Sequence, residues 1–597
     1  MQMKNKSLLC FTFGLGLALA VVWLLALSDF GILRARSASF TVCPAGPPTC
    51  DTSVIQEAVD DAGDGDVIKV AAGTYDDINN LNGHPQIILV EKNITIKGGY
   101  TTGFTEPPDP DANPTTLDAM GQGRVIYIQG KIQPTVEGLR ITGGQAAGLG
   151  GGPYTEDVGG GVLVISATAT LRDNHIFENK ADSTHNGDGG GVYLLDSDAT
   201  LEGNTMISNT AQREGGGVNL ANSPATLVGN TISQNDSGKG EGAGVYLGFS
   251  LAKLEDNTIS ENYGVGVWGG HSAAIIANNT IISNTGSGLF LWECDNIRIT
   301  GNHIAYNSLG GIGGGLQAFG DHMLISGNTV SHNNAEWGGG ISANGDQTMI
   351  RGNIISYNSA SRGGGGFFGD GPVTLASNAF IANNAEMGAG LLIPDATGAH
   401  ITGNTFTGNS ASSQGGGLDL WGGNPILTNN IIANNQSGGV GSAIHTSESA
   451  LHLLHNTIAH NTGGDGSGIY AITNSNISLS NTIIVSHTVG MYIHFDSSAS
   501  LESTLWGSGI WANGTDWTGA GTINHSNEYW GNPDFVDDLA GDYHIGELSD
   551  AIDAGIDTGV HDDIDQHPRP YLAPDIGADE YWPLGALKFI YLPILEK

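Results

Sequence analysis

The sequence contains few charged residues, and positive charge is the scarcer kind. Charged residues make up 14% of the 597 residues, with 21 Lys and Arg against 60 Asp and Glu, so the formal net charge is −39. A surface of this sign repels the phosphate backbone, which argues against nucleic acid as a partner. A cationic partner or a divalent metal is the more natural expectation.

Proline and cysteine are also scarce. Proline occurs 20 times against 93 glycines, and the glycines do not recur as Gly-X-Y triplets, so the composition is not that of collagen. Among the four cysteines, Cys43 and Cys50 flank a Pro/Gly loop, which indicates a disulfide if the compartment is oxidising. Cys294 has no obvious partner. No Cys/His pair has zinc spacing, and no phosphate-binding loop is present.

The N-terminus has the pattern of an export segment. Lys4 and Lys6 precede an apolar run over residues 8–27, and small residues follow at 35–39. This pattern predicts a signal peptide within residues 1–38. The run is long enough to span a bilayer, so an uncleaved membrane anchor through residues 8–27 is the alternative. Both alternatives predict a secreted or cell-surface protein.

The sequence is rich in one phrase, Asn-x-Ile-x-x-Asn or a close variant, which returns every 22 to 30 residues. A second phrase has two or three glycines and an aliphatic residue, as in GGGV from Gly189, and a third is a short strand such as ATLEGN from Ala199. A period near 25 residues is typical of a solenoid in which one coil repeats. The thirteen leading asparagines are Asn174, Asn204, Asn230, Asn257, Asn279, Asn302, Asn328, Asn353, Asn378, Asn404, Asn430, Asn456 and Asn481.

Each repeat holds about three short strands and shows no helical periodicity. Because no single repeat buries its own apolar face, the coils must stack. We expect Ile207, Ile232 and Ile259 to form an inward-facing column. We expect the leading asparagines to form a hydrogen-bonded ladder at one turn, and to tolerate the left-handed conformation that the turn needs.

These repeats resemble those of right-handed parallel β-helix proteins with pectate-lyase-like architecture, from about residue 50 to 520. The resemblance implies an all-β solenoid with about three strands per coil. Residues 53–77 (SVIQEAVDDAGDGDVIKVAAGTYDD) are similar to the usual opening of such proteins. There a short capping helix containing Ile55, Ala58, Val59 and Ala62 precedes a first strand at 67–70. The repeats also resemble those of polymorphic outer-membrane proteins, which residues 380–383 and 406–409 match literally.

The C-terminal part departs from the repeat. We predict a β-helix over residues 39–525, a small acidic module over 526–582 and an apolar tail over 583–597. The module resembles the C-terminal module that follows β-helices in bacterial surface proteins, on the motif Asp-Ile-Gly-Ala-x-Glu-Tyr at 575–581. That resemblance implies an anchoring role. The tail, FIYLPILEK at its end, is too short to span a membrane as a helix.

An aromatic column follows the glycine phrases. If the aliphatic residue after the glycines points inward, the next residue points outward, because strand side chains alternate. Flat exposed rings form a platform on which sugar rings stack. The alternative is that the rings stack on one another and stabilise the sheet. The residues predicted to bind a polysaccharide or cell-surface glycan are Tyr246, Trp268, Phe290, Trp292 and Phe368.

Five successive coils each offer an aspartate a few residues further on: Asp295, Asp321, Asp346, Asp370 and Asp395. Their spacing nearly matches the coil period, so we expect them on adjacent rungs of one turn. Such clustered carboxylates suit calcium, the one cofactor that the sequence suggests. Asp321, Asp346 and Asp370, with His322, are also candidates for acid–base catalysis on a glycan. The alternative is a row of solvated turn aspartates.

Three hypotheses for function remain open. The Gly-His-Gly and Asn-Thr-Asp motifs of polygalacturonase-like β-helices are absent, as is the acidic nonapeptide of calcium-binding β-rolls. The leading hypothesis is therefore a non-catalytic surface protein that binds glycans or mediates adhesion. The second is a polysaccharide lyase or glycoside hydrolase that uses the aspartate column, since fold alone does not fix function. The third is an envelope scaffold without a ligand.

Overall fold

The computed structural model describes residues 38–81, 83–153, 155–181, 186–308, 310–369 and 372–583. The predicted signal or anchor segment therefore lies outside the described residues, apart from Ala38. So do Asp370 and the apolar tail beyond residue 583. None of the helices within the described ranges is long and apolar enough to cross a membrane.

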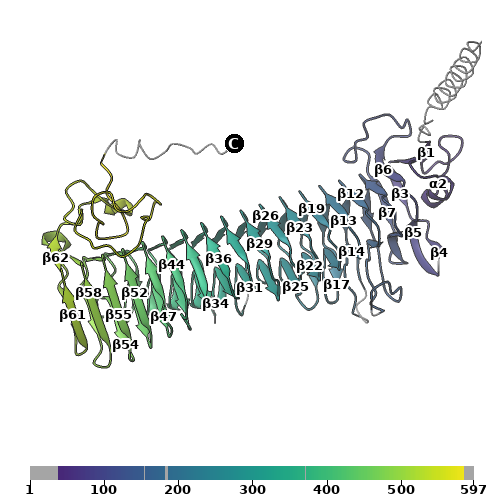
Figure 1. Ribbon diagram of the computed structural model, residues 1–597. Helices are drawn as coiled ribbons and strands as arrows, with labels where there is room; N and C mark the ends of the chain where they lie inside the picture. Colours follow the sequence, from purple (N-terminus) through teal and green to yellow (C-terminus); the bar gives the residue numbers. More distant parts are fainter. Residues whose placement is uncertain are drawn as a thin grey trace, which may run out of the picture.

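The chain forms a long parallel β-solenoid in which each coil contributes one strand to each of three sheets (Figure 1). One coil contains β15 (Thr200–Glu202), β16 (Thr205–Ile207) and β18 (Val218–Ala221). These strands pair in parallel with β19 (Thr226–Val228), β20 (Thr231–Ser233) and β22 (Val245–Gly248) of the next coil. We name the three sheets A, B and C after the strands β15, β16 and β18. The predicted all-β solenoid with three strands per coil is confirmed.

The core is a set of aliphatic columns inside the coil. Met206, Ile232 and Ile259 lie opposite one another on sheet B and are fully buried. Ile232 and Ile259 were predicted to face inward, which is confirmed, whereas the prediction for Ile207 is wrong. Met206 takes that place and Ile207 faces outward, because consecutive strand residues alternate between the two faces.

Two buried asparagine ladders run along the coil. In the first, Nδ2 of Asn204 donates to Oδ1 of Asn230 at 3.0 Å and to the carbonyl of Leu171 at 2.8 Å. The backbone N–H of Asn204 donates to the same Oδ1 at 2.9 Å. A second ladder, which includes Asn209 and Asn235, repeats this pattern at the next turn. The predicted ladder of leading asparagines is confirmed, and each rung satisfies backbone groups that the turn leaves without strand partners.

The left-handed residue of each turn precedes the ladder asparagine. Gly203 has φ 65° and Asp256 has φ 55°, whereas the asparagines that follow them do not have positive φ. The expectation that the ladder asparagine itself takes the left-handed conformation is therefore wrong. Its backbone N–H must face the next coil to reach the next amide oxygen, and the preceding residue makes the bend.

Asn481 does not belong to the ladder. β53 (Thr457–Ala459) pairs with β56 (Ile483–Val485) so that Thr457 lies opposite Ile483, which places Thr482 opposite Asn456. Asn481 occupies the left-handed position, with φ 50°. Its amide donates to the carbonyl of Ile556 at 2.7 Å and accepts from the N–H of that residue at 2.9 Å. The thirteenth asparagine therefore holds the C-terminal module rather than the next coil.

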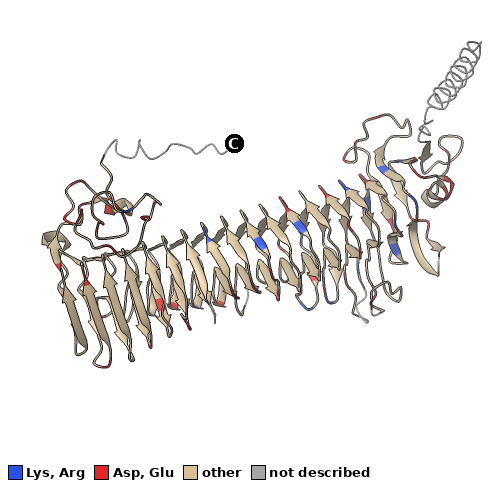
Figure 2. Cartoon of the chain, viewed as in Figure 1, with Lys and Arg blue, Asp and Glu red and all other residues tan. Residues whose placement is uncertain are grey.

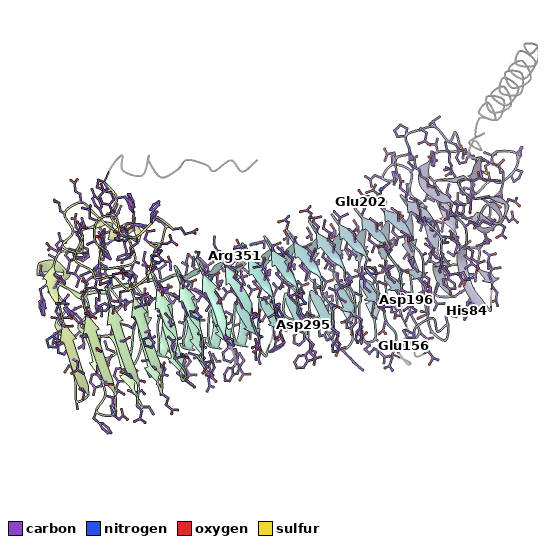
Figure 3. All side chains as sticks on the ribbon, viewed as in Figure 1. His84, Glu156, Asp196, Glu202, Asp295 and Arg351 are labelled. Atoms are coloured by element: carbon purple, nitrogen blue, oxygen red, sulfur yellow. A yellow bond between two sulfur atoms is a disulfide. The ribbon has the colours of Figure 1, made fainter. Side chains whose placement is uncertain are left out.

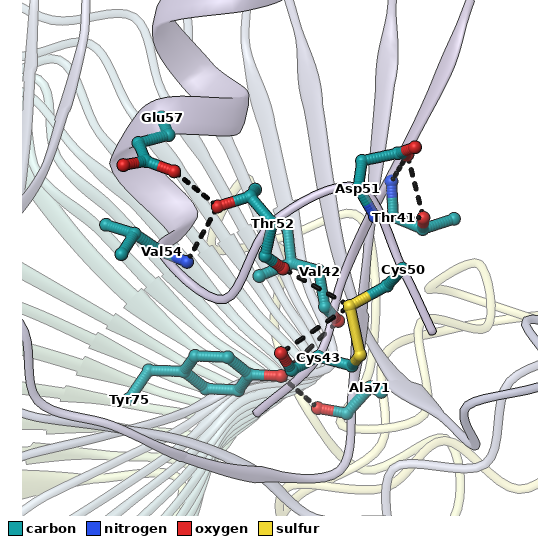
Figure 4. Close-up of a disulfide and its surroundings, with 10 residues drawn as sticks. All are labelled: Thr41, Val42, Cys43, Cys50, Asp51, Thr52, Val54, Glu57, Ala71 and Tyr75. Carbon is teal, nitrogen blue, oxygen red and sulfur yellow. Dashed lines mark hydrogen bonds between the residues drawn. A yellow bond between two sulfur atoms is a disulfide. The ribbon is translucent and has the colours of Figure 1, made fainter. Parts of the chain in front are cut away.

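The N-terminal end is closed by a cap. β1 (Ser39–Val42) pairs with β2 (Val67–Ala71), so the first strand lies earlier than residues 67–70. The predicted capping helix is α2 (Ile55–Asp61), which buries Ile55, Ala58 and Val59 against the open coil. Cys43 and Cys50 form a disulfide within this cap, beside the hydroxyl of Tyr75 (Figure 4).

The C-terminal module folds back over sheet B of the last coils. The coil continues to β62 (Tyr529–Gly531), and the antiparallel strands β63 (Phe535–Asp537) and β64 (Asp542–Ile545) follow. Phe535, Tyr543 and Ile576 bury a second core against Ile431 and Leu505 of the coil. Arg569 is the single Lys or Arg of this acidic module. Figure 2 shows the module with the charged residues of the chain coloured by sign.

Candidate functional site

The predicted aromatic platform is a self-stacked ladder on the outer face of sheet C. The rings of Tyr246 and Trp268 are 4.6 Å apart and nearly parallel, and those of Trp268 and Phe290 are 6.0 Å apart. A Cβ on Gly248 would meet the Tyr246 ring and one on Gly270 would meet the Trp268 ring, so both rings lean along their strands over glycines. Their faces cover one another, and half-buried edges reach solvent. This arrangement is the stacking alternative that the sequence left open.

Trp292 and Phe368 behave differently from this ladder. Trp292 is 46% exposed at the end of β28 (Leu289–Trp292) and meets Phe319 edge to face at 5.3 Å. Phe368 is 1% exposed and packs in the core, so its predicted role in binding is wrong. Phe367 takes the outward position opposite Ser342, because a fourth glycine, Gly366, occupies the inward place that the aliphatic residue holds in other coils.

The aspartate column lies in the turn that leads from sheet C to sheet A, where Figure 3 labels Asp295. Oδ1 of Asp295 accepts from the N–H of Asp321 at 2.8 Å, and Oδ1 of Asp321 accepts from the N–H of Asp346 at 2.8 Å. These three residues are exposed and share one turn on adjacent rungs, as expected. One carboxylate oxygen of Asp295 and one of Asp321 therefore accept a backbone hydrogen bond from the next coil. This arrangement fits the alternative in which the aspartates are exposed turn residues.

Asp395 and His322 do not extend the chain of hydrogen bonds that links Asp295, Asp321 and Asp346. Asp395 accepts from the hydroxyl of Thr397 at 2.7 Å in a local turn, and His322 is exposed beside Asp321. Asp370 lies outside the described residues. Calcium binding or catalysis by these residues stays a prediction.

A set of charged side chains that sequence reasoning missed lies at the N-terminal end of the aromatic ladder. Residues 144–153 and 155–160 belong to a long loop, and Val158 of this loop packs with Leu163 and Tyr193 of sheet C. Where the loop ends, Glu156, Asp188, Arg213, Glu214 and Asn219 come together; we call these five residues the acidic site. Glu241 follows on the next coil, bridged to Glu214 through the backbone.

One guanidinium serves three carboxylates of the acidic site. Arg213 Nη2 lies 2.6 Å from Asp188 Oδ2 and 3.7 Å from Glu156 Oε1, and its Nε lies 3.2 Å from Glu214 Oε1. Asp188 is 2% exposed and also accepts from the N–H of Glu214 at 3.2 Å. Burying more carboxylates than cations is costly unless a proton or a ligand compensates for the excess charge.

Burial and crowding shift the acid–base properties of the site. Burial raises the pKa of Glu214 to about 7, and the neighbouring charge of Asp188 adds to the shift. Burial also raises the pKa of Asp188, while Arg213 opposes that shift. The hydrogen bond with Asp188 raises the pKa of Arg213, which stays charged. A strongly perturbed carboxyl beside a specific charged partner is typical of functional sites.

Asn219 is the least satisfied residue of the acidic site. It is 1% exposed and stands in the outward column of sheet C between Tyr193 and Tyr246. Its amide interacts with the Glu214 carboxyl, which lowers the pKa of that carboxyl, but neither Nδ2 nor Oδ1 makes a hydrogen bond of good geometry. A buried polar group whose hydrogen bonds are incomplete costs up to roughly 1–3 kcal/mol, part of which a polar ligand would recover.

The sequence carried a signal for this site. Asp188, Glu214 and Glu241 each stand directly before a glycine phrase, with spacings that follow the coil period. Their position directly before the glycines aligns them on adjacent coils. The loop that covers Tyr193 has no counterpart in other repeats, so the burial that perturbs these carboxyls was not visible in the sequence.

A separate groove of about 610 Å³ lies beneath the loop between β6 (Thr95–Tyr100) and β7 (Thr115–Asp118). Pro107 and Pro110 line one side, and Lys97 and Glu137, which form an ion pair at 3.0 Å, line another. Lys97 and Glu137 thus neutralise each other in this groove, whereas in the acidic site one guanidinium is shared among three carboxylates.

Comparisons with known proteins agree with the fold. The family model described as the right handed beta helix region matches residues 75–281, 243–406 and 339–515. No curated protein matches the sequence. Among solved structures, the Dettilon tailspike protein is 14% identical over 65% of this chain and 68% of its own, with a TM-score of 0.33.

Two further solved structures are similar to this chain. A mannuronic acid specific polysaccharide family 6 lyase from human gut microbiota is 12% identical over 65% of this chain and 86% of its own, with a TM-score of 0.31. Pectate lyase Pel9A is 12% identical over 92% and 97%, with a TM-score of 0.17. At these levels of similarity no residue role transfers to this chain.

Proposed function

The chain belongs to the right handed beta helix region family, and we propose that its acidic site binds a neutral or amino-sugar polysaccharide outside the cell. The observation that carries the proposal is the buried amide of Asn219, whose hydrogen bonds are incomplete and which stands beside carboxylates that share one guanidinium. A sugar hydroxyl both donates and accepts, so one ring offers partners for the amide and for Glu214 together. The export pattern of the N-terminus and the Cys43–Cys50 pair favour an extracellular setting.

A sugar suits this site better than a metal ion does. Within the described residues, three His, Cys, Asp or Glu ligand atoms converge closely enough for a cation only at His544, Asp565 and Asp579, in the C-terminal module. The carboxylates of the acidic site are held apart around Arg213 instead. A polyol spans that spacing with hydrogen bonds, whereas a cation needs direct oxygen contacts of about 2.0–2.6 Å.

The charge of the site narrows the class of glycan. Among the described residues of this site, Arg213 is one cation beside the carboxylates of Glu156, Asp188 and Glu214, with Glu241 on the next coil. Uronate carboxylates would be repelled from these residues, whereas neutral sugars and protonated amino sugars would not. From the acidic site the chain of sugars would pass over the edges of Tyr246 and Trp268 toward the exposed Trp292.

The test is equilibrium binding of the purified chain to xylan, mannan, galactan, chitosan oligomers and polygalacturonate. We expect a neutral glycan or chitosan to bind, and Asn219→Ala and Glu214→Gln each to weaken binding about tenfold or more. Glu202→Gln is the matched control, because Glu202 forms an exposed ion pair with Arg172 on sheet A. Binding of polygalacturonate alone, or binding that both site variants leave intact, would contradict the proposal.

Glycoside hydrolysis at the same site is the second candidate. Hydrolysis by paired carboxyls requires one protonated and one ionised group. Glu214, with its pKa of about 7, and Asp188, paired with Arg213, have the environments that separate such roles. Release of reducing ends that is abolished in Glu214→Gln, even at glycan concentrations high enough to compensate for the weaker binding of this variant, would distinguish an enzyme from a binding protein. The polysaccharide lyase or hydrolase at the aspartate column is tested in the same assay with Asp321→Asn.

A further inference from the structure

The C-terminal module contains a second set of converging polar side chains, on three separate segments. His544 lies on β64 (Asp542–Ile545), Asp565 lies in the loop that follows, and Asp579 lies near the end of the described chain. We propose that His544 Nε2, Asp565 and Asp579 bind one divalent metal ion of the zinc type. This site is independent of the proposed glycan site.

The distances suit a metal ion. The three ligand atoms all lie within 4.8 Å of one another, and His544 Nε2 lies 3.0 Å from Asp565 Oδ2. Zinc–nitrogen and zinc–oxygen bonds of about 2.0–2.2 Å in a tetrahedron separate neighbouring ligand atoms by roughly 3.3–3.5 Å. Small side-chain movements would therefore bring all three ligands into place, with a fourth position left to water.

The histidine is oriented as a metal ligand is. Its Nδ1 lies 2.5 Å from Asp542 Oδ1, which fixes the ring and directs Nε2 toward Asp565 and Asp579. A carboxylate on the far nitrogen of a ligating histidine is the usual support of such sites. Asp579 is held too, because its Oδ2 accepts from the N–H of Ile545 at 2.8 Å.

The cluster is largely closed to solvent. The Nε2 atom of His544 is buried and faces Asp565 in an ion pair at 3.0 Å, and Asp579 is only 7% exposed. Arg569, the single Lys or Arg of the module, is engaged elsewhere, with Glu580 and backbone carbonyls. A divalent metal ion in place of the His544 proton would bring more positive charge to these carboxylates than an imidazolium does. An imidazole with two carboxylates suits zinc or manganese, whereas calcium prefers oxygen ligands alone.

The metal would join the module to the coil. Ala578, next to Asp579, donates its N–H to the hydroxyl of Thr457 on sheet B at 3.1 Å. Linking β64, the Asp565 loop and this terminal segment through one ion would close the module over the last coils. Binding to the folded state alone stabilises that state in proportion to ligand concentration.

The test uses the full chain, stripped with a chelator and titrated with Zn²⁺, Mn²⁺ or Ca²⁺. We expect about one Zn²⁺ per chain by equilibrium dialysis and slower proteolysis of the module in Zn²⁺, both lost in His544→Ala. The matched control is His494→Ala, because His494 forms a similar pair with Asp496 at 2.8 Å. Asp565→Asn, at an exposed residue, is a second variant that keeps the fold.

Four results would overturn the proposal. The first three are an absence of stoichiometric Zn²⁺ binding, equal binding in the wild type and Asp565→Asn, and loss of binding in the His494→Ala control. A stoichiometric Ca²⁺ ion that leaves Zn²⁺ without effect would also overturn it.

Discussion

The side-chain amide of Asn328 donates to Oδ1 of Asn353 at 2.9 Å, and the backbone N–H of Asn328 donates to the same oxygen at 2.9 Å. The amide oxygen of Asn353 thus holds both the side chain and the backbone of Asn328 on the preceding coil. This relationship, repeated along the solenoid, sets the register of neighbouring coils.

Replacement of Asn328 by alanine should lower the free energy of unfolding by about 3 kcal/mol. The change removes the acceptor that Asn302 uses and the donor that reaches Ile299, and it leaves buried groups without partners. Urea denaturation measures the loss. Asn476→Ala, at an exposed position on sheet A, should change stability by less than about 0.5 kcal/mol. Similar losses in the two variants would argue against the ladder as a source of stability.

Phe367 and Phe368 should respond in opposite ways to truncation. Phe368→Ala opens a cavity in the core and should cost about 3–5 kcal/mol, whereas Phe367→Ala, at a half-buried outward position, should cost far less. Thermal unfolding of the two variants measures the two losses of stability. A greater loss for Phe367→Ala would contradict the strand register.

The stability of the wild type should fall as pH rises between about 4.5 and 7. In the folded state the pKa of Glu214 is about 7, against a reference value of 4.5, so the folded state holds this proton more tightly than the unfolded state does. The resulting stabilisation is complete below pH 4.5 and is lost as the pH rises to about 7. The shift corresponds to about 3 kcal/mol at most. Denaturation at several pH values should show a shallower slope for Glu214→Gln. The Glu202→Gln control should keep the wild-type slope, and an unchanged slope in Glu214→Gln would refute the assignment.

Reduction of the Cys43–Cys50 disulfide should loosen the N-terminal cap. Closing this short loop restricts the unfolded chain by roughly 2–3 kcal/mol in the chain-entropy model. Hydrogen exchange of α2 and β1 in a Cys43→Ser, Cys50→Ser variant should become faster, while exchange in the central coils should not change. Uniform acceleration along the solenoid would instead show that the cap controls global unfolding.

Much of the fold was predictable because a repeat multiplies every local signal. The glycine and asparagine phrases recur often enough to predict three strands per coil and the ladder, and the resemblance of residues 53–77 to the opening of β-helix proteins predicts the capping helix; the structure contains all three. The errors came where one residue was added or shifted. Gly366 moved Phe368 into the core, and a one-residue offset removed Asn481 from the ladder. In strands, a shift of one residue exchanges the two faces.

The sequence by itself determined the period, the stacked architecture and the buried asparagines, because each depends on contacts between equivalent positions of adjacent coils. The acidic site and the His544 cluster were decided by tertiary structure. Glu156 reaches Arg213 from a loop that has no repeat, and Asp579 reaches His544 after the chain has folded back over the coil. Periodicity does not encode such contacts, since they join segments that obey no common spacing.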